Sequence, residues 1–94
     1  MTINVYFGKG NGTYVDDRKP LEQVKLVKGF IEKGKDFEIV TCSPYVIEAV
    51  DAYKKDKEDI EVKYFNDGEE SNISLILSEI SEAFFKIQDY KENK

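Results

Sequence analysis

The segment Phe37–Val50, FEIVTCSPYVIEAV, most constrains the fold, because it places a buried strand directly before a helix. Phe37–Thr41 is short, apolar and rich in β-branched residues, which is typical of a buried strand in a parallel sheet. Ser43 and Pro44 follow, and they suit the N-cap and the first turn of a helix. Strands that alternate with helices in this way form crossovers, so the segment predicts an α/β fold with parallel pairing.

The rest of the chain carries the same two kinds of pattern. Alternating apolar residues predict strands at Thr2–Phe7 and Ile60–Phe65, and apolar residues three or four apart predict helices at Pro20–Lys33, Pro44–Lys55 and Ser74–Tyr90. Glycine-rich turns suggest that two shorter strands, Thr13–Val15 and Glu69–Ile73, pair back on the strands before them.

These elements fit one small domain that covers residues 1–94. We predict an α/β fold with a small mixed sheet of about 3–5 strands and three helices, in the order β-hairpin, α, β, α, β-hairpin, α. Residues 91–94 are expected to form a frayed tail.

Composition excludes several classes of function. The chain has 14 basic and 19 acidic residues, a net charge of −5 and no histidine. The acidic balance argues against direct nucleic-acid binding, and the lack of histidine removes the commonest general base and metal ligand. A lone Cys42 fits a reducing compartment, and no apolar run has the length of a membrane span. We therefore expect a cytoplasmic protein with no cofactor, no metal and no membrane contact.

Acidic residues concentrate around one predicted strand and its turn. They are Glu58, Asp59, Glu61, Asp67, Glu69 and Glu70. Charged loops are usually only solvated surface. The alternative is an acidic face that docks on a basic protein partner, or that mimics nucleic acid in a basic groove.

The last predicted helix carries more aromatic residues than one face can bury. Phe84 and Phe85 are adjacent, so both cannot pack against the same sheet face. Phe85 and Tyr90 are therefore candidates for an exposed apolar patch. A homodimer through this helix is a hypothesis.

Two segments lie where an anion might bind. The helix that begins after Cys42 offers free N–H groups and a favourable dipole. The glycine-rich segment Gly8–Thr13, GKGNGT, has three residues between Gly8 and Gly12 where a phosphate loop has four. The residue directly before Thr13 is a glycine, where a phosphate loop has its lysine. We interpret this segment as a hairpin turn.

The sequence Thr41-Cys42-Ser43-Pro44-Tyr45 resembles the switch-histidine region of ABC-type and overcoming-lysogenization-defect-like ATPases, where a buried strand ends in Thr-His-Ser-Pro-Tyr. The likeness extends over about residues 16–90. Cys42 stands where the family has its histidine, and Asp16-Asp17 lies where the Walker B acidic pair is expected. The resemblance implies the fold of part of an ATPase without its catalytic groups.

This resemblance favours a non-catalytic protein that acts by protein–protein interaction. Its partner would be a basic protein or a larger ATPase or nuclease, and a phage or mobile-element regulator, inhibitor or anti-defence role would fit. The arrangement around Cys42 is also similar to thioredoxin- and glutaredoxin-like proteins, although the resolving cysteine is absent. That similarity implies a thiol oxidoreductase with Cys42 as nucleophile. The alternative from the residues is that Cys42 is a small buried side chain.

Overall fold

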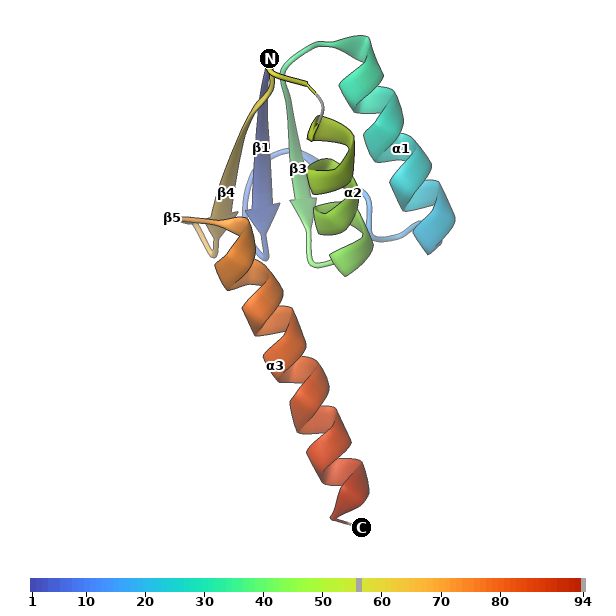
Figure 1. Ribbon diagram of the computed structural model, residues 1–94, viewed down its shortest axis with the longest axis vertical. Helices are drawn as coiled ribbons and strands as arrows, with labels where there is room; N and C mark the ends of the chain where they lie inside the picture. The colour runs from blue at the N-terminus through green and yellow to red at the C-terminus, as the bar shows by residue number, and fades with distance from the viewer. Residues whose placement is uncertain (56, 94) are drawn as a thin grey trace.

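The computed structural model describes residues 1–55 and 57–93 as a five-stranded mixed sheet with three helices (Figure 1). The strands are β1 (Thr2–Phe7), β2 (Thr13–Tyr14), β3 (Phe37–Thr41), β4 (Glu61–Asn66) and β5 (Glu69–Ser71). The helices are α1 (Pro20–Lys33), α2 (Pro44–Lys54) and α3 (Ile73–Glu92). The predicted α/β class is confirmed. The helix α3 runs into the expected frayed tail, and Lys94 lies outside the described residues.

The sheet has the strand order β2-β3-β1-β4-β5. Strand β1 pairs in parallel with β3 on one side and with β4 on the other, and β4 pairs antiparallel with β5. The predicted second hairpin is therefore confirmed. Its turn is made by Asp67 and Gly68, both at positive φ, as tight hairpin turns require.

The predicted first hairpin is wrong. Strand β2 pairs in parallel with β3 and does not return to β1. The segment 8–12 instead crosses β3, and an added Cβ at Gly12 would lie 2.6 Å from the carbonyl oxygen of Glu38. Gly12 also has a φ of 130°, which L side chains rarely adopt. The glycines thus permit a close backbone crossing, not a tight turn.

One face of the sheet packs against the helices and forms the core. Side chains alternate along each strand, so Ile3, Val5, Ile39 and Tyr64 point to the same buried face. The helices α1 and α2 lie side by side (Figure 1), and the core extends to both of them. The opposite face carries Tyr6 and Phe65 among others, with their rings stacked at 4.9 Å.

The helix α3 leaves this body and projects beyond the sheet (Figure 1). Only Ile76 in α3 is fully buried, and Ile73, Leu77 and Ile80 pack partly against the core. The following residues extend away, so the molecule measures 49 Å along its longest axis and 25 Å along its shortest. In residues 1–55 and 57–93, no helix combines the length and the apolarity needed to cross a membrane.

Candidate functional site

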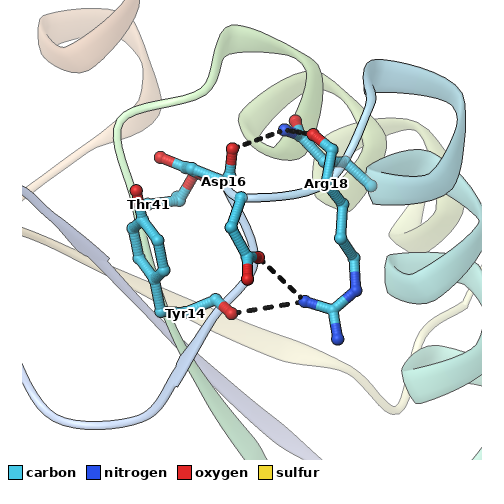
Figure 2. Close-up of polar contacts among 6 residues, drawn as sticks. Tyr14, Asp16, Arg18 and Thr41 are labelled. Atoms are coloured by element: carbon cyan, nitrogen blue, oxygen red, sulfur yellow. Dashed lines mark hydrogen bonds and ion pairs between the residues drawn. The ribbon is translucent and has the colours of Figure 1, made fainter.

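The carboxyl end of β3 holds a compact polar network centred on Asp16. The Asp16 carboxylate accepts a hydrogen bond from the Thr41 hydroxyl at 2.6 Å and another from the Cys42 backbone N–H at 2.6 Å. Figure 2 shows Asp16 beside Thr41, at the strand end that leads into α2. Asp16 thus supplies an internal anion at the helix start where the sequence favoured the binding of an external anion.

The same network fixes the start of α2. The Ser43 backbone N–H donates to the Thr41 hydroxyl oxygen at 2.9 Å, and the Ser43 side chain accepts from the Val46 N–H as the N-cap. The Ser43 hydroxyl also donates to the amide oxygen of Gln23 at 2.5 Å. These bonds tie α1, β3 and α2 together at the carboxyl end of β3.

Sequence reasoning missed Gln23. This side chain is 5% exposed, and its amide nitrogen donates to the backbone carbonyl of Arg18 at 2.7 Å. Its spacing could have indicated that it is buried, because Gln23 stands four residues before Val27 and eight before Ile31, and these two residues of the same helix face are both buried. Leu21, two residues earlier in α1, is by contrast 65% exposed.

Asp17 does not share the contacts of Asp16. It is exposed and forms an ion pair of 3.2 Å with Arg18. The Arg18 guanidinium also reaches the backbone carbonyl of Tyr14, as Figure 2 shows. The two adjacent acids therefore point apart, and only Asp16 belongs to the strand-end network.

Cys42 is exposed, so the expectation of a buried thiol is wrong. Its backbone is held by Asp16, and it precedes the N-cap residue of α2 by one position. Tyr45 in the first turn of α2 is also exposed.

The six acidic candidates do not form one surface. The first three lie before or at the start of β4, and Asp67, Glu69 and Glu70 lie in the hairpin at its other end. A strand rises about 3.3 Å per residue, so roughly 20 Å separates the two groups. We call the second group, together with Glu79 of α3, the acidic hairpin surface; these four residues line one hollow of about 620 Å³.

Among the described residues, most of the exposed large apolar side chains lie on α3. Phe84, Phe85, Ile87 and Tyr90 are between 54% and 65% exposed, as the adjacent aromatics suggested. We define Ala83, Phe84, Ile87 and Tyr90 as the outer stripe, because they share one side of the helix. Phe85 lies off this stripe, about 160° around the helix axis from Ala83 and from Ile87.

Comparisons with protein-family models, with curated proteins and with solved structures find no match. Within residues 1–55 and 57–93, no three His, Cys, Asp or Glu side chains are grouped so that they would hold a metal ion. The geometry of the chain itself therefore carries the functional argument.

Proposed function

We propose that this chain is a non-catalytic α/β protein that acts by binding other protein molecules. Its docking elements are the projecting part of α3 and the acidic hairpin surface at the base of that helix. The observation that carries this proposal is the outer stripe, where Phe84 is 58% exposed and Ile87 is 54% exposed on a helix that leaves the body. Exposed apolar surface of this kind marks interaction sites.

The hydrogen bonds at the carboxyl end of β3 support the proposal that the chain does not bind or hydrolyse nucleotides. In α/β sheets, ligands bind outside the carboxyl ends of the strands. Here the Asp16 carboxylate already accepts hydrogen bonds from the Thr41 hydroxyl and the Cys42 N–H. A phosphate at this place would have to displace or repel a fixed negative charge. The segment 8–12 also leads into β2, so it has no helix N-terminus behind it.

The finer proposal concerns the partner. The acidic hairpin surface favours a basic protein, because complementary charge raises the rate of association. The resemblance to part of an ATPase further suggests a cytoplasmic regulator or inhibitor of a larger ATPase or nuclease, of the kind that phages and mobile elements encode. This role rests on the resemblance, the small size and the charge of the chain.

The first test measures ATP binding and turnover by the purified full chain. We expect neither. Hydrolysis that disappears in Asp16→Asn, but persists in Asp17→Asn, would overturn the non-catalytic proposal.

The second test measures partner binding through the acidic hairpin surface. Proteins captured from the native host are purified and titrated with the wild type and with a Glu69→Lys, Glu70→Lys variant. Affinity is expected to fall in the variant and with added salt. Binding that is indifferent to both the charge reversal and the salt would remove the acidic hairpin surface from the proposal.

An exposed thiol at the start of a helix favours a second candidate function, thiol oxidoreduction by Cys42. With no second cysteine in the chain, the Cys42 thiolate would attack a substrate disulfide, forming a mixed disulfide with one sulfur and releasing the other as a thiolate. The measurement is the rate of Cys42 alkylation against pH, compared with the same protein in denaturant. A native rate that rises only at alkaline pH, as in an ordinary thiol, would exclude this candidate.

A further inference from the structure

The apolar residues of α3 follow a spacing that continues past the body. Ile73, Ile76, Ile80, Ala83, Ile87 and Tyr90 are separated by three and four residues in turn. This is the spacing of a coiled-coil seam, in which each such residue contacts a neighbouring helix. The first half of the seam has a neighbour, because Ile76 is fully buried and Ile73 and Ile80 pack against the core. In the second half, where α3 extends beyond the body (Figure 1), Ile87 is 54% exposed.

We propose that a second copy of this chain covers the outer stripe, with the two α3 helices antiparallel. This inference rests on the proposed function, since it names the occupant of the docking helix. A two-fold axis near residue 85 would place Ile80 of one copy against Tyr90 of the other. The same axis sets the small Ala83 against the larger Ile87, and Phe84 against its own counterpart. The stripe therefore complements itself, as an isologous dimer interface requires.

Charge favours the antiparallel direction. Each chain has a net charge of −5, and the acidic hairpin surface lies at the base of α3. An antiparallel pair puts the two acidic bases at opposite ends, whereas a parallel pair would bring them together. Lys86 would face Lys86 of the second copy. Its ammonium already lies 3.7 Å from the carboxylate of Glu82, which offsets that repulsion.

The exposed area suits a weak dimer of this kind. Phe84, Ile87 and Tyr90 are 58%, 54% and 63% exposed. Side chains of this size present about 200 Å² each when free, so roughly 350 Å² per copy is available from these three. Two copies, with the flanking stems of long side chains, would bury about 1,000 Å², which is the lower limit for a specific interface.

Other exposed apolar residues extend the available surface. Leu21 and Tyr45, in the first turns of α1 and α2, are 65% and 53% exposed. The first turns of α1 and α2 lie at the end of the body from which α3 projects (Figure 1). The end of the second copy's α3 would approach this surface, while the acidic hairpin surface would remain accessible to a larger partner.

The test is sedimentation equilibrium of the full chain, compared with Phe84→Glu and Phe85→Glu. The two residues are adjacent and similarly exposed, but only Phe84 lies on the outer stripe. A wild-type dimer with a Kd in roughly the micromolar range is expected. Phe84→Glu should raise that Kd by at least about 30-fold, and Phe85→Glu should leave it within about threefold. Circular dichroism checks that both variants remain folded.

A crosslinking arm tests the helix direction. In a Cys42→Ser background, Lys86→Cys should form an intermolecular disulfide on mild oxidation, because Lys86 lies opposite itself in the antiparallel pair. Lys91→Cys, which would lie opposite Leu77 of the second copy, should crosslink at a much lower rate. Equal rates for the two variants would overturn the antiparallel arrangement.

A wild-type chain that stays monomeric up to about 1 mM would overturn the inference. So would a dimer that survives Phe84→Glu unchanged. Neither result would overturn the proposed function, which fails if the chain hydrolyses ATP in a reaction that depends on Asp16. The two failures are therefore distinguishable.

Discussion

Replacing Asp16 by alanine should destabilise the fold far more than the same change at the neighbouring Asp17. The carboxylate of Asp16 accepts two hydrogen bonds of 2.6 Å, from the Thr41 hydroxyl and the Cys42 N–H. Thr41 is 1% exposed, so its hydroxyl would lose its acceptor with little access to water. Hydrogen bonds to a charged group contribute about 1.5–3 kcal/mol each. Because Asp16 itself is only half-buried, we expect a loss of about 2–4 kcal/mol.

The measurement is urea unfolding followed by circular dichroism, with thermal unfolding as a second readout. For a domain of this size, 1 kcal/mol shifts Tm by about 4–8 °C, so Asp16→Ala should lower Tm by roughly 10–25 °C. Asp17→Ala breaks only an exposed ion pair with Arg18, and it should cost about 0.5 kcal/mol or less.

A double-mutant cycle with Thr41→Val separates the specific bond from a general charge effect. The two side chains bond directly, so their effects should fall short of additivity by about 1–2 kcal/mol. Additive effects, or an Asp16→Ala variant no less stable than Asp17→Ala, would refute the assignment of Asp16 as the anchor of this junction.

Two further predictions follow from single side chains. Burial, with repulsion from Asp51 and Glu48, raises the pKa of Tyr64 to about 12. An unfolded tyrosine ionises near 10, so the stability that protonated Tyr64 contributes is present below pH 10 and is lost as the pH rises toward 12. Tyr64→Phe should reduce that alkaline loss in pH-dependent urea titrations, and an unchanged titration would contradict the prediction. In the same urea assay, Gly12→Ala should destabilise by at least about 2 kcal/mol, because its Cβ would meet the Glu38 carbonyl. Gly29→Ala, inside α1 with open space around its Cβ, should stabilise by about 0.5–1 kcal/mol; equal effects of the two glycine changes would count against the close crossing.

The local elements could be predicted from the sequence because their signals are local. The bounds of β1, α1 and β3 agree with the predicted ranges, since alternation, a proline at a helix start and a glycine at a helix end act within a few residues. The placement of β2 could not be predicted in the same way. A strand of two residues after a glycine-rich loop is compatible with a hairpin or with a crossing, and the pairing with β3 is decided by contacts with residues about 25 positions later.

The same difference between local signals and long-range contacts decides which parts of the candidate site could be predicted. Ser43 was predicted as an N-cap, because the serine, the proline and the apolar spacing are contiguous, and the structure confirms it. The bond between Asp16 and Thr41 spans 25 residues. Either residue alone is compatible with a solvated surface. The pairing follows only once β2 is known to lie beside β3, so the misplaced strand also concealed the partner of Asp16.

The exposure of α3 follows from its length relative to the body. The residues from 73 to 80 lie on the core, and the twelve from 81 to 92 extend beyond it. A helix of about twelve residues is only marginally stable by itself, and the ion pair between Lys86 and Glu82 adds about 0.5 kcal/mol at most. Polar side chains on the outer stripe would serve a free helix better, because they would keep it soluble without exposing aromatic surface. Ile87 instead continues the seam of the buried half, and Phe84 lies beside that seam on the outer stripe. The same residues that make this part of α3 costly to expose make it suited to a second helix of equal pitch.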